Sequence, residues 1–125
     1  MLRQKSFNQE RQVYEYNIMN PEGQRVGMAQ LRLIPSKSTE MPKGFESYVY
    51  YEVDSEHRNK GYATEALKDL LREAKKHKLE VLIATVNSDN TASIKVLEKC
   101  GGEFVATGKT TSGLSVLKYS FKLNR

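Results

Sequence analysis

Hydrophobic and polar residues follow two different spacings along this chain. Segments 13–19 and 25–34 alternate loosely and are rich in β-branched and aromatic residues, and the turn sequence Asn-Pro-Glu-Gly at 20–23 separates them. This pattern predicts a β-hairpin. Segment 46–53, which contains three tyrosines, predicts a third strand. The polar segment 35–44 contains two prolines and predicts an exposed loop before that strand.

A helical spacing follows the third strand. Six apolar residues form one stripe with a period of 3.6 residues and charged residues lie opposite, which predicts a helix from about residue 63 to 78. The nearly continuous apolar run 79–86 predicts a central, buried strand. Asn90 is expected to cap a second helix over 91–100, which ends before Gly101.

Two further strands are predicted at 104–107 and 114–123, so the expected order is β-β-β-α-β-α-β-β, with no internal repeat. The strand–helix–strand unit over 46–86 should make a right-handed crossover that joins parallel strands. We therefore predict a single α/β domain over residues 1–125, with a mixed sheet and a helix on each side or nearby.

Composition and charge narrow the class of protein. A single cysteine among 125 residues cannot form an internal disulfide and favours a reducing cytoplasm. Apolar runs are too short for a membrane span, and no apolar segment follows the first charges as a signal peptide requires. The net charge of +5 favours an anionic partner. Basic and acidic residues alternate on the long helix and zinc-finger spacing is absent, so neither nucleic acid nor a metal is expected.

The segment 57–67, His-Arg-Asn-Lys-Gly-Tyr-Ala-Thr-Glu-Ala-Leu, joins the third strand to the long helix. Gly61 lacks a Cβ, so the chain there can approach a ligand closely and take a positive φ. The first N–H groups of the helix have no internal partner, and together with the helix dipole they form an anion site beside Arg58 and Lys60. This turn is expected to bind a pyrophosphate. A tight turn with a solvated basic edge is the alternative.

Two longer motifs lie on either side of the predicted central strand. Residues 53–67 contain Arg-x-x-Gly-x-Ala, and residues 86–102 contain Asn-x-x-Ser-x-x-x-x-Glu-Lys-x-Gly. Together they resemble motifs A and B of the GNAT superfamily of acetyl-CoA-dependent N-acetyltransferases. The resemblance covers about residues 48–105 and implies a GNAT-like fold around a central βαβ cofactor unit.

The resemblance implies acetyl-CoA as co-substrate and assigns it a site. Backbone groups of Val53 and Ser55 would pair with the pantetheine arm, which enters where the third strand splays from the fourth. Asn90 and Ser93 would face the lower pantetheine and the thioester. The pyrophosphate would be bound by the backbone N–H groups of Arg58, Asn59, Lys60, Gly61, Tyr62, Ala63 and Thr64.

The implied reaction is direct attack on the thioester, in a ternary complex, by a primary amine of a small molecule or a protein N-terminus. The N–H of Val53 would stabilise the oxyanion. Glu52 is the candidate base, although a solvent-facing strand carboxylate is the alternative for this residue. Leu97 occupies a position where many members carry a tyrosine acid, so another group or water must supply that proton. A non-catalytic acyl-CoA-binding module of the same fold is the alternative function.

The family's N-terminal acceptor-side helices are the part that this sequence does not match. The first 12 residues show no helical stripe, so we expect a compact member with an open site. A homodimer would close such a site, or a large acceptor would supply the missing wall. The strand residues expected to add exposed apolar surface there are Met28, Leu31, Tyr48, Tyr50 and Tyr51.

Overall fold

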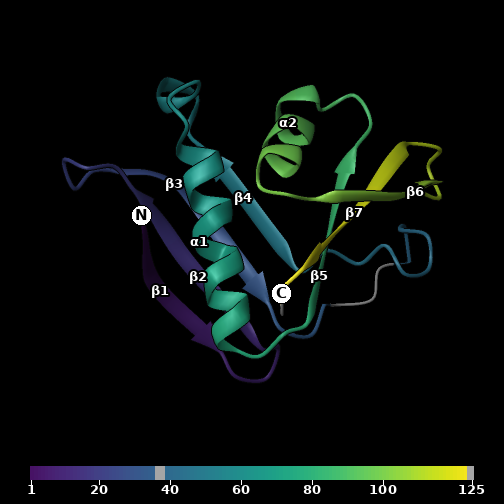
Figure 1. Ribbon diagram of the computed structural model, residues 1–125, viewed down its shortest axis with the longest axis horizontal. Helices are drawn as coiled ribbons and strands as arrows, with labels where there is room; N and C mark the ends of the chain where they lie inside the picture. The colour runs from purple at the N-terminus through teal and green to yellow at the C-terminus, as the bar shows by residue number, and fades with distance from the viewer. Residues whose placement is uncertain (36–38, 124–125) are drawn as a thin grey trace.

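The computed structural model describes residues 1–35 and 39–123, so the part of the expected loop at 36–38 lies outside the described residues. Its elements form two antiparallel sheets and two α-helices, which confirms the predicted α/β class (Figure 1). No helix within the described ranges is long and apolar enough to cross a membrane.

The first sheet has the strand order β1-β2-β3-β4. Its strands are β1 (Leu2–Asn8), β2 (Val13–Met19), β3 (Arg25–Arg32) and β4 (Val49–Val53). The β2–β3 pair confirms the predicted hairpin. Strand β1 was not predicted. Six of its seven residues are exposed, so its sequence carries no apolar alternation, and pairing with the edge of β2 makes it a strand.

The second sheet has the order β5-β7-β6 and contains the central strand β5 (Val81–Asn87). Its other strands are β6 (Glu103–Lys109) and β7 (Ser115–Lys122), close to their predicted bounds. Helix α1 (Tyr62–Lys76) follows β4 after the short 3-10 helix η1 (Ser55–His57). Helix α2 (Thr91–Lys99) follows β5, and Gly101 takes a φ of +90° just beyond it, as predicted.

Strands β4 and β5 meet at one end and then separate. The N–H of Tyr48, just before β4, donates a 2.8 Å hydrogen bond to the carbonyl of Ile83 on β5. Beyond that bond the strands point the same way but diverge (Figure 1), and no ladder joins them among the described residues. The mixed sheet that we predicted is therefore divided into two antiparallel sheets, and residues of β4 and β5 line a cavity of about 220 Å³. The predicted splay of these strands is present.

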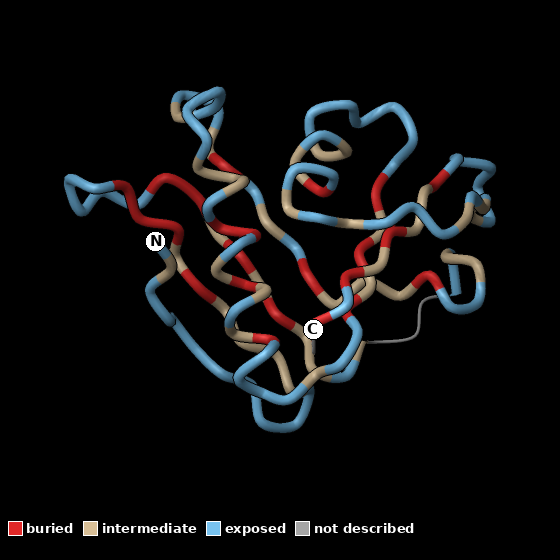
Figure 2. The backbone as a smooth tube through the Cα atoms, in the orientation of Figure 1, coloured by how far each residue is buried: buried red, intermediate tan, exposed pale blue. Residues whose placement is uncertain are grey.

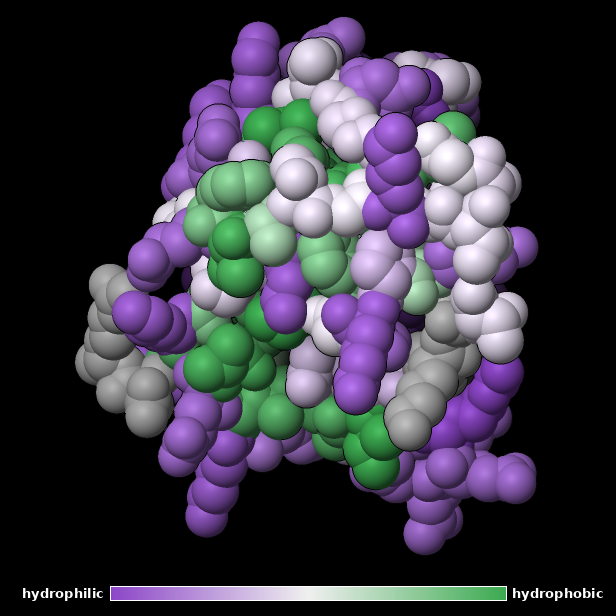
Figure 3. All heavy atoms as spheres, turned by 90° about the vertical axis from the view of Figure 1, so that its right-hand side faces the viewer, coloured by the Kyte–Doolittle hydropathy of each residue, from purple (hydrophilic) through white to green (hydrophobic). Residues whose placement is uncertain are grey.

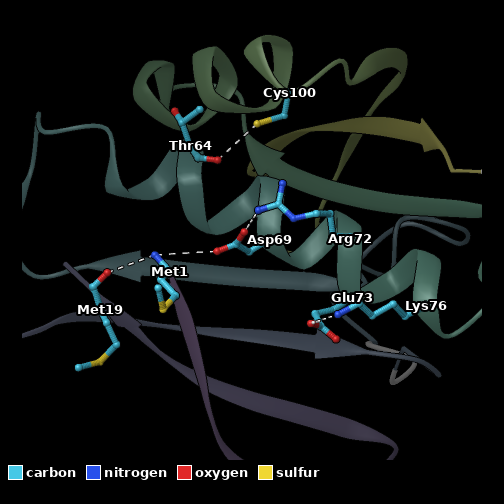
Figure 4. A network of polar contacts seen from close by, with 8 residues as sticks. All are labelled: Met1, Met19, Thr64, Asp69, Arg72, Glu73, Lys76 and Cys100. Atoms are coloured by element: carbon cyan, nitrogen blue, oxygen red, sulfur yellow. Dashed lines mark hydrogen bonds and ion pairs between the residues drawn. The ribbon is translucent and has the colours of Figure 1, made fainter. Parts of the chain in front are cut away.

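Helix α1 covers one face of the first sheet, and the buried positions of both elements face each other (Figure 2). Leu67 and Leu70 on α1 and Ile18 and Leu31 on the strands are fully buried. The expectation that Leu31 adds to an exposed surface is therefore wrong, because its place in the strand alternation directs it towards α1. On the polar side of α1, Asp69 contacts Arg72 and the amino group of Met1 (Figure 4).

The remaining residues expected at an exposed apolar surface differ in accessibility. Tyr50 is 43% exposed, whereas Met28, Tyr48 and Tyr51 are half-buried. On the side of the second sheet, hydrophobic side chains lie among hydrophilic ones (Figure 3). The most exposed apolar residues of β6 and the following turn are Phe104, Val105 and Leu114.

Candidate functional site

A sharp turn connects the end of β4 to the start of α1. Asp54 makes the last backbone bond to β3, at 2.8 Å to the carbonyl of Val26. Asn59 and Gly61 then take φ values of +64° and +83°. Because the first intrahelical bond of α1 runs from the N–H of Glu65 to Gly61, the preceding N–H groups have no partner within the helix. We call residues 58–64 the cradle, since successive backbone N–H groups at such a turn form a concave site for an anion.

The cradle is tied to β4 by a side chain. Arg58 Nε donates a 3.0 Å hydrogen bond to the carbonyl oxygen of Val53. Since the N–H of Asp54 points at β3, antiparallel alternation directs the N–H and carbonyl of Val53 away from β3, towards the gap before β5. The carbonyl of Val53 already accepts the bond from Arg58. The N–H of Val53 is therefore the group that can bind a ligand in the gap.

An open groove of about 820 Å³ runs from the cradle past the end of β4 and along α2. We call it the β4–α2 groove. It collects the predicted site residues with two exceptions: Ser55 and Lys60 do not line it. The Ser55 hydroxyl instead lies 3.4 Å from the carboxylate of Glu56 on the exposed side of η1. The predicted residues that line it are Glu52, Val53, Arg58, Asn59, Gly61, Tyr62, Ala63, Thr64, Asn90 and Ser93.

Helix α2 forms the opposite wall of the groove. Its N-cap is Asn90, whose side-chain oxygen accepts a 3.1 Å hydrogen bond from the N–H of Ser93, as predicted. Sequence reasoning missed the rest of this wall. Residues three and four apart share one helix face, and that spacing was the available signal. The missed wall residues are Thr91, Ala92, Lys95, Val96 and Lys99.

Tyr51 on β4 reaches across the gap to α2. Its hydroxyl lies 3.0 Å from Ser93 Oγ, and both residues line the groove and the smaller cavity beside it. Burial raises the pKa of Tyr51 above its usual value, so the phenol keeps its proton at neutral pH. This places a protonated hydroxyl at the junction of the two cavities.

Glu52 lies on the other side of the same strand. Side chains alternate along β4, so Glu52 and Tyr50 project to the face opposite Tyr51 and Val53. The Tyr50 hydroxyl donates a 2.8 Å hydrogen bond to Glu52 Oε2, and this bond raises the pKa of Tyr50. An exposed carboxylate with a fixed neighbour therefore lines the groove at the sheet face that α1 leaves uncovered.

Of the residues towards the end of α2 and just beyond it, Leu97 is buried and Cys100 is half-buried. Leu97 is 2% exposed and lines the smaller cavity, where its side chain can supply no proton. Cys100 does not line the groove. Its thiol contacts the carbonyl of Thr64 at 3.7 Å (Figure 4), and burial raises its pKa. Among the described residues no cluster of three or more His, Cys, Asp or Glu side chains is arranged to bind a metal.

The sequence and the fold are similar to those of known proteins. The model of the acetyltransferase (GNAT) domain family matches residues 1–103. A ribosomal-protein-alanine N-acetyltransferase from Brucella melitensis is 27% identical, with a TM-score of 0.68 over 89% of this chain and 69% of that one. A GNAT-family acetyltransferase from Bacillus anthracis is 25% identical, with a TM-score of 0.65 over 89% and 67%. No curated protein matches the sequence.

A third similar structure was solved with ligands. The spermidine N-acetyltransferase from Vibrio cholerae, in complex with CoA and spermine, is 14% identical, with a TM-score of 0.72 over 92% of this chain and 68% of that one. The present chain is shorter than such proteins, and it spans 64–66% of the length of several that it matches. These likenesses agree with the GNAT-like fold predicted from the two motifs.

Proposed function

Because this chain belongs to the GNAT acetyltransferase family, we propose that it transfers the acetyl group of acetyl-CoA to a primary amine. The observation that carries this proposal is the junction of the cradle with the β4–α2 groove. A backbone anion site opens there into a channel between two separated strands. A molecule with a pyrophosphate and a long, thin arm fits such a channel.

The cradle suits the pyrophosphate of acetyl-CoA. An ideal Cβ placed on Gly61 would meet no protein atom within 4 Å, so the space above this residue is open to a ligand. The unpaired N–H groups at the start of α1 and the guanidinium of Arg58 would bind the phosphate oxygens. The pantetheine arm would then run along the free edge of β4, with the N–H of Val53 available to its amide or to the thioester.

The transfer removes two protons from the amine nitrogen and adds one to the leaving sulfur. Glu52 would accept a proton from the incoming ammonium, and the amine nitrogen would form its bond to the thioester carbon. The N–H of Val53 would stabilise the resulting oxyanion. The nitrogen would then lose its second proton to solvent as the carbon–sulfur bond breaks. The leaving thiolate would take a proton from the Tyr51 hydroxyl, which recovers one from solvent. Tyr51 supplies the donor that Leu97 cannot.

An amine acceptor is favoured by the similar proteins. The Brucella melitensis and Vibrio cholerae enzymes are named for ribosomal-protein alanine and for spermidine, and both of these acceptors are amines. We include in the proposal a cytoplasmic location, which the single cysteine favours. A homodimer also remains a prediction, and light scattering that shows a 14.3 kDa monomer at micromolar concentration would contradict it.

A non-catalytic acyl-CoA-binding module is the alternative, and two assays separate the possibilities. In a thermal-shift assay, acetyl-CoA and CoA should raise the melting temperature while ATP should raise it less, because ATP lacks the pantetheine arm. Release of free CoA thiol should then depend on an added amine. Stabilisation without amine-dependent release would favour the binding module, and equal responses to ATP and CoA would contradict both functions.

A further inference from the structure

Two lysines of α2 line the groove opposite the cradle. Lys95 and Lys99 are one helical turn apart, so they lie on the same face of α2, and both side chains are exposed. Across the groove lies Arg58. The groove therefore carries positive charge on both walls, although the cradle alone would satisfy a pyrophosphate.

Lys95 and Lys99 have no ion-pair partner among the residues that the structure describes, unlike two of the cations on α1. On the outer face of α1, Arg72 pairs with Asp69 and Lys76 pairs with Glu73 (Figure 4). No carboxylate lies within ion-pair distance of Lys95 or Lys99 in the described part of the chain.

The carboxylates near the groove do not neutralise this charge. Among the residues described, Glu52 is the single carboxylate in the lining, and it is hydrogen-bonded to Tyr50 at the end of β4. The groove lining thus has more positive than negative side chains, since one arginine and two lysines stand against one carboxylate. Unpaired cations of this kind, held at a concave surface, attract an anion of more than one charge.

A phosphate monoester is the group that this charge fits. A pyrophosphate in the cradle would be bound mainly by fixed backbone N–H groups, which are on the α1 side of the groove. Lysine ammonium groups act as mobile point charges and suit a terminal phosphate, which carries nearly two negative charges near neutral pH. Lys95 and Lys99 lie on the facing wall. A phosphate monoester bound there would lie across the groove from a pyrophosphate in the cradle.

We propose that Lys95 and Lys99 form a subsite for a phosphate monoester carried by the same ligand whose pyrophosphate lies in the cradle. The groove then selects CoA, which bears a 3′-phosphate, over 3′-dephospho-CoA. This inference rests on the proposed function, since it takes CoA as the ligand.

Calorimetric titration with the two forms of CoA tests the subsite. The wild type should bind CoA about tenfold more tightly than 3′-dephospho-CoA at low ionic strength, which corresponds to two exposed charge pairs. The double variant Lys95→Gln/Lys99→Gln should lose this preference, because its affinity for CoA falls while its affinity for 3′-dephospho-CoA stays the same. The preference of the wild type should shrink as salt is added.

A charge-matched control separates a local site from general attraction. The variant Lys75→Gln/Lys122→Gln removes the same charge from exposed residues that do not line the groove, and it should keep the full preference. Equal affinity of the wild type for both ligands, or equal loss in both double variants, would overturn the subsite while leaving the proposed function intact. Failure of the wild type to bind either ligand would instead contradict the proposed function.

Discussion

The hydroxyl groups of Tyr51 and Ser93 lie 3.0 Å apart and join β4 to α2 across the groove. If Tyr51 donates the proton to the leaving thiolate, Tyr51→Phe should lower kcat on the order of 10²-fold. The KM of the Tyr51→Phe variant for acetyl-CoA should change little. Steady-state kinetics with a saturating amine measures both constants.

A buried tyrosine outside the groove provides the control for that variant. The hydroxyl of Tyr119 donates to Glu98 at 3.2 Å and lies outside the groove. Tyr119→Phe should therefore cost about 1 kcal/mol of unfolding free energy, as loss of one hydrogen bond does, without a change in kcat. Equal kcat values for Tyr51→Phe and the wild type would remove Tyr51 from the reaction.

Glu52 is the proposed acceptor of the ammonium proton. Glu52→Gln keeps the shape of the side chain and an oxygen for the Tyr50 hydroxyl, but it removes the base. We expect kcat to fall on the order of 10²-fold and the dependence of kcat on pH to change. Glu22→Gln, in an exposed turn, is the matched control. A pH–rate profile that is identical in Glu52→Gln and the wild type would argue for water as the base.

Gly61 should be required for ligand binding rather than for folding. It has a φ of +83°, and Gly23, in a distant turn, has a φ of +81°; a Cβ on either would meet no atom within 4 Å. Valine at either position should therefore cost a similar amount, about 1–3 kcal/mol, through backbone strain. Only Gly61→Val should also lose CoA affinity, by about tenfold or more, because its side chain fills the ligand space. If calorimetry showed the same CoA affinity in Gly61→Val and Gly23→Val, the pyrophosphate would not bind at the cradle.

Gly27 fixes the spacing between β3 and β4. A Cβ at this position would lie 2.2 Å from the carbonyl oxygen of Glu52 and 2.9 Å from the Cα of Val53, both of which are backbone atoms. Gly27→Ala must therefore push β4 away and should lower the free energy of unfolding by about 1–3 kcal/mol. Urea denaturation measures this loss. If Gly27→Ala had the same urea midpoint as the wild type, the added methyl group would not strain the packing of β3 against β4.

Cys100 should take no covalent part in the transfer. Its thiol is half-buried, lies outside the groove lining and has a raised pKa, so less thiolate is present at neutral pH than for a free cysteine. Cys100→Ala should keep its turnover, and alkylation of the wild type by iodoacetamide should be slow and should accelerate as pH rises. Mass spectrometry that found acetylated Cys100 during turnover would point to an acyl-enzyme.

The sequence predicted those parts of the site that depend on local chemistry. The turn at Gly61, the cap at Asn90 and the separation of the third and fourth predicted strands follow from backbone rules and from the two motifs. Helix capping and positive φ are decided by a few adjacent residues, so they can be inferred without the tertiary structure.

Other features depend on contacts between distant segments. Strand β1 has a polar sequence and exists through its pairing with β2. The position of Leu31 under α1, and the bond from Tyr51 to Ser93, require the register of β4 and the docking of α2. Lys95 and Lys99 are exposed charges on α2, and their place in the groove depends on the opposite wall, which distant segments form.

Transfer of a labelled acetyl group tests the central claim most directly. The protein is incubated with acetyl-CoA that carries a ¹³C-acetyl group and with a panel of primary amines, including a polyamine and peptides with free α-amino groups. Mass spectrometry then follows both products. We predict that at least one amine gains the labelled acetyl group in amounts equal to the CoA thiol released, at a rate above the protein-free reaction. Tight binding of acetyl-CoA with no labelled amine across the panel would contradict an acetyltransferase and favour a binding module.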